Sequence, residues 1–173
     1  MSAISLDLDT TVQEAMDASI RETFSMMIGE ELEHIETTSF SSSATQPSGG
    51  VVDSEESIDE ATVVVGLTGG LQGSVSVCVD RGAALLWAEK LIDHKTDHLD
   101  QTVVDAIGEL GNMVVGGAKG RLEDFMLTLG LPSVLLAGPT RLAFPSNCDP
   151  RQIKYRVAGH ELSVFISLVT ANA

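Results

Sequence analysis

The segment 61–79 constrains the fold most, because it has the pattern of two β-strands joined by a glycine-rich turn. Residues 61–67 form an apolar run, and in 74–79 valines alternate with serine and cysteine, the period of a half-buried strand. That alternation points Cys78 away from the valine face. Between the runs, Thr68-Gly-Gly-Leu-Gln-Gly73 supplies glycines, which adopt the positive φ angles of a tight hairpin. The segment therefore predicts an antiparallel sheet.

A glycine cluster of this kind can also cradle a phosphate, as in a P-loop. A P-loop needs Gly-Lys-Ser/Thr at the start of a helix, whereas this turn has no lysine and leads into a strand. We therefore expect no nucleotide at this turn.

The first sixty residues combine a helix with a polar loop. Residues 11–36 carry apolar side chains at helical spacing, with Asp9 or Thr10 as the N-cap. Serine, glycine and proline dominate 39–50, which is typical of a loop. These sixty residues hold 14 acids and one base (net −13), whereas residues 61–173 hold 11 acids and nine bases (net −2). The acidic third is either a solvated surface that maintains solubility or a steering surface for a basic partner.

The overall charge of −15 disfavours nucleic acids and membrane surfaces as partners, because both are anionic. No apolar run approaches the roughly 20 residues that span a bilayer, and the chain begins without the basic and apolar regions of a signal peptide. Two cysteines cannot build a disulfide framework. We therefore expect a cytoplasmic protein.

After the hairpin come helices and then strands. Residues 81–93 form a short helix, and a long helix, capped by Asp100, runs from residue 101 to about 129 and ends before Leu131-Pro132. Three β-rich stretches follow, at 133–144, 152–158 and 161–170, the last two joined by the turn Ala158-Gly159-His160. No regular βαβ alternation occurs, so we predict an α+β fold, an antiparallel β-sheet layered with two long α-helices, in a single domain over residues 1–173.

The long helix has two faces of different chemistry. An apolar stripe forms one face, with Val103, Ile107, Leu110, Val114, Ala118 and Phe125. Asp105, Glu109, Asn112 and Gly116 share the opposite face, so the Glu109 carboxylate and the Asn112 amide, three residues apart, project the same way. Glu109 and Asn112 are therefore the candidate functional residues.

Glycine is frequent in this helix, at positions 108, 111, 116, 117 and 120. Each glycine inside a helix costs roughly 0.5–1 kcal/mol relative to alanine. Small residues allow a close approach, either by another helix of the same fold or by a partner that must reach Glu109 and Asn112 with hydrogen bonds. Both interpretations stay open from the spacing alone.

The run Asp105-Ala-Ile-Gly-Glu109-Leu-Gly-Asn112-Met, followed by Leu131-Pro132-Ser-Val, resembles the signature of the CheC/CheX/FliY family of chemotaxis phosphatases. In that family an Asp or Ser precedes E-x2-N, and a proline follows some twenty residues later. Here 19 residues separate Asn112 from Pro132. The hairpin Val65 to Gly73 and the helix Glu22 to Gly29 resemble the CheX branch, and the resemblance extends from about residue 15 to the last strand. It implies a CheX/CheC-like fold with internal pseudo-duplication.

The resemblance also implies a function, the hydrolysis of the aspartyl phosphate of a CheY-like response regulator in chemotaxis or another two-component circuit. Asn112 would orient the attacking water, and Glu109 would pair with a lysine of the regulator. Asp105, Gly108 and Gly116 would line the partner surface. Magnesium is expected only in the regulator's own site, so the protein itself needs no cofactor or metal. The alternative is a non-catalytic domain of the same fold that binds a regulator or a flagellar switch component.

The duplication is expected to contain one functional helix. When 17–29 is laid over 105–117, the Asp-Ala pair and the final glycine align, but Arg21 and Phe24 occupy the positions of the candidate acid and amide. Arginine cannot dock a lysine and phenylalanine cannot orient water, so we expect Phe24 in the core.

CheX-like proteins associate through their sheets, so the resemblance also implies a homodimer. The uncharged stretch 162–170 is the predicted exposed edge, with an interior strand as the alternative.

Other chemistry-bearing residues give weaker signals. His94 and His98 fall between two helices, where a solvated linker is favoured over a zinc site that would need further ligands. Cys78 and Cys148 have no histidine at a suggestive spacing, so no catalytic thiol is expected. Five methionines, Met16, Met26, Met27, Met113 and Met126, are expected to fill core space.

Overall fold

The computed structural model describes residues 3–40, 51–53, 61–136, 141–143 and 148–171, so most of the predicted 39–50 loop lies outside the described residues. The helices are α1 (Ala3–Ile28), α2 (Arg81–Ile92) and α3 (Gln101–Arg121), with a 3-10 turn at Glu123–Phe125. The strands are β1 (Glu33–Ser39), β2 (Val51–Asp53), β3 (Ala61–Thr68), β4 (Leu71–Val79), β5 (Thr128–Leu129), β6 (Ser133–Leu136), β7 (Arg141–Ala143), β8 (Arg151–Val157) and β9 (His160–Thr170).

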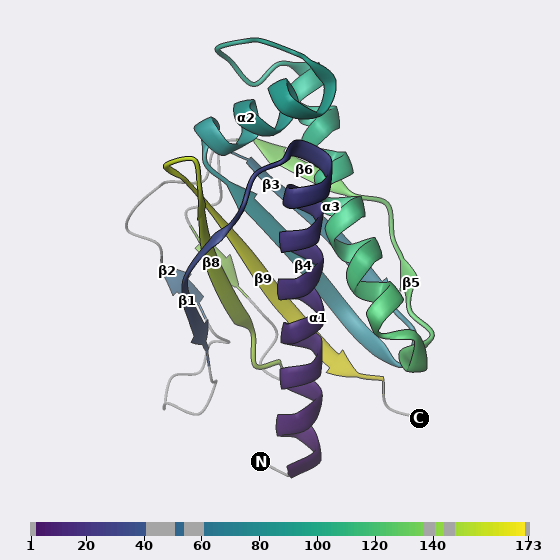
Figure 1. Ribbon diagram of the computed structural model, residues 1–173. Coiled ribbons are helices and arrows are strands. Elements are labelled where there is room, and N and C mark those ends of the chain that lie inside the picture. Colours follow the sequence, from purple (N-terminus) through teal and green to yellow (C-terminus); the bar gives the residue numbers. More distant parts are fainter. Residues whose placement is uncertain (1–2, 41–50, 54–60, 137–140, 144–147, 172–173) are drawn as a thin grey trace.

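These strands form two antiparallel sheets. The 7-stranded sheet has the order β1-β8-β9-β4-β3-β5, with β6 also paired to β3, and β2 pairs with β7 in a separate sheet. All pairings are antiparallel, and α1 and α3 lie side by side across one face of the large sheet (Figure 1). This confirms the predicted α+β class and the glycine-turned hairpin of β3 and β4.

The chain is built from two similar halves. The first runs α1-β1-β2-β3-β4 and the second α3-β6-β7-β8-β9, with α2 following the first half and the short β5 inserted between α3 and β6. β4 pairs with β9 at the centre, β1 and β6 lie toward opposite edges, and β2 pairs with β7. This arrangement places α1 and α3 at matching positions, as the predicted pseudo-duplication requires.

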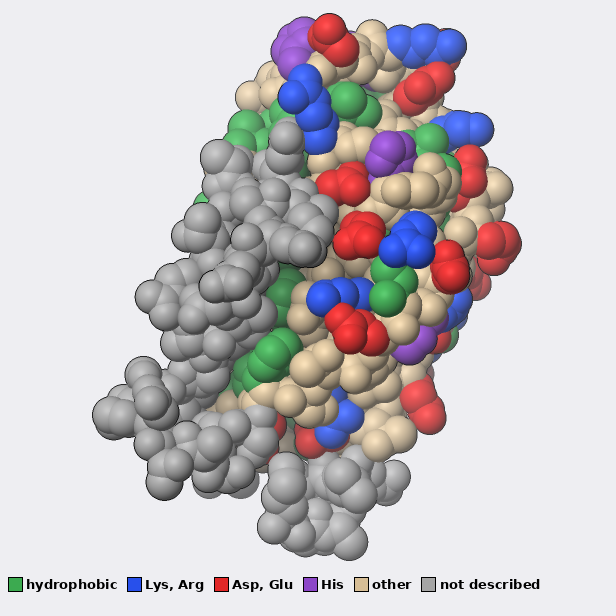
Figure 2. Space-filling view, turned by 90° about the vertical axis from the view of Figure 1, so that its left-hand side faces the viewer, with side chains coloured by type: hydrophobic (Ala, Val, Ile, Leu, Met, Phe, Trp, Pro, Cys, Tyr) green, Lys and Arg blue, Asp and Glu red, His purple; other side chains and the backbone are tan. Residues whose placement is uncertain are grey.

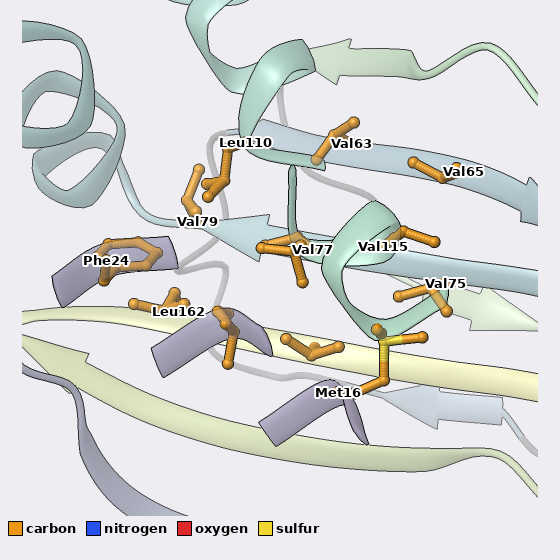
Figure 3. Close-up of a cluster of buried hydrophobic side chains, with 14 of the residues drawn as sticks. Met16, Phe24, Val63, Val65, Val75, Val77, Val79, Leu110, Val115 and Leu162 are labelled. Carbon is orange, nitrogen blue, oxygen red and sulfur yellow. The ribbon is translucent and has the colours of Figure 1, made fainter. Parts of the chain in front are cut away.

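The core lies between the sheet and the two long helices. Figure 3 shows Met16 and Phe24 from α1 and Leu110 and Val115 from α3 gathered with valines of β3 and β4. The labelled side chains are all buried, and each fully buried aliphatic or aromatic side chain contributes roughly 1.5–3 kcal/mol. The core therefore holds α3 firmly on the sheet.

Contacts between the helices fix α3 further. The Trp87 ring of α2 lies 5.2 Å from that of Phe24, and its indole N–H donates to the Ala106 carbonyl of α3 at 2.8 Å. The Ser19 hydroxyl of α1 donates to the Val114 carbonyl of α3 at 2.6 Å. The outward face of α3 is thus held in a defined direction.

α1 differs from its predicted range at both ends. It starts at Ala3, so Asp9 and Thr10 lie inside the helix and neither is its N-cap. It ends at Ile28, because Gly29 adopts φ 70° and its N–H bonds to the Ser25 carbonyl, a left-handed C-cap. Residues 33–36, which were predicted to continue the helix, belong to β1, whose backbone groups pair with β8. Strand pairing outweighs the helical spacing there.

α3 also ends earlier than predicted, at Arg121 instead of about residue 129. A 3-10 turn follows, and Met126 adopts the left-handed φ of 46°. Thr128 and Leu129 then pair with β3 as β5. Phe125, predicted on the core stripe of the helix, lies in the 3-10 turn and is only partly buried.

For the C-terminal strands one prediction is confirmed and two are corrected. β8 and β9 form the predicted hairpin, with Ala158 and Gly159 at φ 48° and 86° and His160 already in β9. The stretch predicted at 133–144 divides into β6 and β7, which belong to different sheets. β9, whose 162–170 stretch was predicted as an exposed edge, is an interior strand between β4 and β8, because both neighbours pair with it.

The two edges of the large sheet carry different side chains. On β1, Glu36 pairs with Lys154 of β8 at 2.7 Å, and Figure 2 shows acidic and basic side chains interspersed on this side. On β6, Leu135 and Leu136 are 48% and 47% exposed, and the strand has no charge. Charges on an edge strand hinder pairing with another chain, so β6 is the edge better suited to it.

Candidate functional site

Asp100 anchors the start of α3, as predicted. One carboxylate oxygen accepts from the Val103 N–H at 3.0 Å and the other contacts His94 Nε2 at 2.7 Å. The bond from the Val103 N–H and the bond to His94 hold the pKa of Asp100 below its usual value, because both favour the charged carboxylate. The cap fixes where the helix begins and so which residues face outward.

Glu109 and Asn112 lie on the outward face of α3, one turn apart. The Glu109 side chain is exposed and that of Asn112 is half-buried. In the described part of the chain, neither side chain makes a hydrogen bond or an ion pair. Asp105, one turn earlier, is exposed and accepts a hydrogen bond from Gln101 at 2.9 Å. A carboxylate and an amide on a fixed helix are therefore free to bind a group outside the chain.

Three glycines of α3 face the rest of the fold, and packing leaves no room for a side chain at two of them. A Cβ at Gly111 would lie 2.6 Å from Val63 Cγ2 of β3, and one at Gly117 would collide with the Ser19 hydroxyl of α1. Gly108 is buried, and a Cβ there would lie 3.7 Å from Val134 Cγ2 of β6, an ordinary contact distance. Gly108, a predicted partner-surface residue, therefore does not lie on the exposed face. These positions fit the interpretation of close packing within the fold.

The other two glycines are open. A Cβ at Gly116 or at Gly120 would meet no atom of the described chain within 4 Å. Gly116 lies one turn after Asn112, on the face where the sequence placed it, and Gly120 lies one turn further. These two positions fit the second interpretation, a surface that another molecule approaches.

A hollow at the C-terminal end of this face was not predicted. Its lining includes Gly116, Lys119, Gly120, Met126 and Leu129. Met126 is 82% exposed, so the prediction that it fills the core is wrong, as it is for Met26 at 74%, whereas Met16 is fully buried. No periodicity in the sequence signals Met126, because its position depends on where α3 stops.

The matching positions of α1 are engaged within the fold. Arg21 Nε donates to the Asp17 carboxylate at 2.9 Å and another guanidinium nitrogen donates to the Leu32 carbonyl at 2.8 Å. The Tyr155 hydroxyl donates to Asp17 at 2.8 Å, and burial together with this bond raises the pKa of Tyr155. Phe24 is fully buried, as predicted.

The histidines between α2 and α3 do not converge. His94 contacts Asp100, whereas His98 Nδ1 lies 3.0 Å from its neighbour Asp97. Among the residues that the structure describes, no group of three or more His, Cys, Asp or Glu side chains is placed to hold a metal ion. The contacts fit the favoured interpretation of a polar linker.

Both cysteines are buried. Cys78, predicted to point away from the valine face, is 1% exposed because that second face of the sheet is also covered at this point. Burial raises the pKa of Cys148, which keeps the thiol protonated and unreactive.

None of the helices in the described ranges is both long and apolar enough to cross a bilayer.

Comparison with protein families finds a match to the model described as "Chemotaxis phosphatase CheX" over residues 61–156. The matched region includes β3, β4, α2 and the whole of α3, and therefore Glu109 and Asn112. The comparison with curated proteins finds no match.

Solved structures share the fold over most of the chain. A CheC-like superfamily protein from Shewanella sp. PV-4 is 21% identical with a TM-score of 0.77, covering 92% of this chain and 97% of that one. The chemotaxis protein CheX from Desulfovibrio desulfuricans is 18% identical with a TM-score of 0.73, covering 92% and 99%. The CheX–CheY–BeF3–Mg2+ complex from Borrelia burgdorferi contains a chain 21% identical with a TM-score of 0.68, covering 91% and 97%.

Proposed function

Since the chain belongs to the CheX family of chemotaxis phosphatases, we propose that it hydrolyses the aspartyl phosphate of a CheY-like response regulator in the cytoplasm. The observation that carries the proposal is the pairing of Glu109 with Asn112 on a fixed, outward helix face, with both side chains free of partners in the described chain. The similar Borrelia protein was solved with CheY, which supports a regulator as the partner.

In this proposal Asn112 positions the water. Hydrolysis of an acyl phosphate needs a water held in line with phosphorus, and positioning and electrostatics supply most of the catalysis. An amide oxygen accepts one hydrogen of that water, so it sets the direction of attack without acting as a strong base. The half-buried setting of Asn112 restricts its rotamers, which favours one direction.

Glu109 serves to engage the regulator. Its carboxylate is exposed one turn from Asn112, where it can pair with a lysine beside the phosphorylated aspartate. Magnesium, in this proposal, belongs to the acidic site of the regulator, and the chain supplies no ligand to it. Asp105 and Gly116 flank this pair and complete the surface that meets the regulator.

We further propose a homodimer, joined through β6 instead of β9. The β6 strand presents two half-exposed leucines and no charge, whereas β1 is charged. Pairing of two β6 edges across a two-fold axis would satisfy their backbone groups. Light scattering at micromolar concentration should give the dimer mass for the wild type and the monomer mass for Leu135→Lys, and a wild-type monomer would refute the dimer.

The test of the phosphatase proposal measures phosphate loss from CheY-like regulators with a catalytic amount of the chain. The wild type should accelerate the loss over many turnovers. Glu109→Ala should weaken binding of a BeF3-treated regulator as well as slow turnover, whereas Asn112→Ala should reduce turnover and leave binding nearly unchanged.

The competing function, a non-catalytic domain that binds a regulator or a flagellar switch component, gives a different result. Such a domain would bind the regulator but would not accelerate phosphate loss at any concentration. Tight binding without turnover would therefore replace the phosphatase proposal with the binding module.

A further inference from the structure

The hollow at the end of α3 directly continues the face that carries Asn112. Gly116 and Gly120, which help to line it, lie four and eight residues after Asn112, or about 6 and 12 Å along the helix axis. A standard interface covers about 800 Å² per partner, a disc with a radius of about 16 Å. An interface of that size centred on Asn112 therefore also covers the hollow.

Met126 is exposed at this hollow, on a turn that backbone hydrogen bonds hold in place. Its N–H bonds to the Glu123 carbonyl at 3.0 Å, and the Phe125 carbonyl accepts from the Gly70 N–H of the β3–β4 hairpin at 2.8 Å. A Cβ at Gly69 would lie 2.6 Å from the Met126 carbonyl oxygen, so the hairpin glycine lets the turn approach. The backbone is held at a left-handed φ while the side chain stays 82% exposed. A soft, polarizable side chain held in this way suits contact with an irregular apolar group.

Lys119 adds a charge to the hollow. In the described chain Lys90, Lys95 and Lys154 each pair with a glutamate, whereas Lys119 makes no ion pair. It lies seven residues after Asn112, two helical turns along the same face. Glu123 also lines the hollow, so the hollow carries one charge of each sign, and its Lys119 ammonium is the group complementary to the carboxylates around a phosphoryl group.

We propose that this hollow is a specificity pocket for the response regulator. It receives an apolar side chain that the regulator projects beside its phosphorylated aspartate, against Met126 and over Gly116 and Gly120, while Lys119 pairs with a carboxylate of the regulator. The inference rests on the proposed function and adds to it the residues that select among regulators. The catalytic step depends on Asn112, so substitutions in the hollow should change KM and leave kcat unchanged.

The experiment uses the CheY-like regulator that the wild type dephosphorylates fastest. Met126→Ala should raise KM about tenfold, the effect of losing the burial of one large apolar side chain, with kcat unchanged. Gly120→Leu should also raise KM, because its side chain fills the hollow. Met26→Ala is the matched control, because Met26 is similarly exposed but lies on α1, outside the hollow. Thermal unfolding of each variant shows that the fold is retained.

Each failure has a distinct signature. If Asn112→Ala lowers kcat but the hollow variants leave KM unchanged for every regulator tested, the pocket is wrong and the phosphatase proposal stands. If no regulator is turned over, equilibrium binding of a BeF3–Mg2+ receiver domain replaces KM, and unchanged binding by Met126→Ala overturns the pocket. If Met126→Ala alters the mass by light scattering but not KM, a second copy of the chain occupies the hollow and the inference is also overturned.

Discussion

The helices α1 and α3 hold matching places in the two halves of the chain, yet corresponding positions on them are used in opposite ways. On α1, Arg21 is bonded to Asp17 and to the Leu32 carbonyl, and Phe24 is fully buried. On α3, the corresponding Glu109 and Asn112 make no side-chain bond within the described residues. One helix stabilises the fold, and the other presents polar groups to the outside.

This difference shows how a duplicated framework can separate stability from function. Phe24 packs against Trp87, which in turn bonds to α3 through the Ala106 carbonyl, so the first helix supports the second. The open glycines of α3 cost helix stability, and a Cβ at either position would meet no atom of the described chain within 4 Å. Buried residues in the first half contribute the rigidity that exposed residues in the second half need.

The largest expected difference between the halves is in stability. Phe24→Ala removes a fully buried ring and should lower the free energy of unfolding by about 3–5 kcal/mol. The matched variant Asn112→Ala should lower it by less than about 1 kcal/mol, because the amide is half-buried and unbonded in the described chain. Urea unfolding of both variants measures the contrast, and equal losses would show that α1 and α3 do not divide these roles.

Substitutions at the glycines of α3 should likewise fall into two groups, those at packed positions and those at open positions. Gly111→Ala forces a Cβ against Val63 and should destabilise by about 1–3 kcal/mol. Gly116→Ala meets open space and should stabilise by about 0.5–1 kcal/mol through higher helix propensity. Chemical denaturation distinguishes the two signs. A destabilising Gly116→Ala would mean that this glycine serves the fold, as Gly111 does.

The smallest expected effect concerns acid sensitivity at the start of α3. The folded pKa of Asp100 is lowered, so its stabilising contribution is present above the unfolded pKa of about 3.9 and is lost as pH falls through the folded value. Asp100→Asn keeps a good N-cap but removes the carboxylate. The stability difference between this variant and the wild type should therefore shrink as pH falls below about 4. A constant gap between Asp100→Asn and the wild type across this pH range would contradict the assignment.

Local sequence patterns predicted the elements that local interactions stabilise. The glycine-turned hairpin of β3 and β4 and the Asp100 cap involve neighbours in sequence, and both are confirmed. The ends of α1 and α3 depend on pairing with β8 and β3, which lie far along the chain. For the same reason the sequence could not decide between an edge and an interior position for β9, because that position depends on pairing with β4 and β8.

The candidate site was predictable only in part. Helical spacing placed Asp105, Glu109, Asn112 and Gly116 on one face, where the structure has them. It could not tell that Gly108 faces β6, because tertiary packing decides which glycines are open. The exposed Met126 was also missed, since its display depends on the early end of α3 and on the clamp by the β3–β4 hairpin.

The most direct test of the difference between the halves compares Asn112→Ala with Arg21→Ala in one assay of aspartyl-phosphate loss from a CheY-like regulator. Loss of one positioned polar group in a transition state typically lowers the rate about 10²–10³-fold, and we predict this reduction for Asn112→Ala. Arg21→Ala should keep the wild-type rate at a temperature where it remains folded. Near-normal turnover by Asn112→Ala, or loss of turnover by a fully folded Arg21→Ala, would contradict the assignment of function to α3.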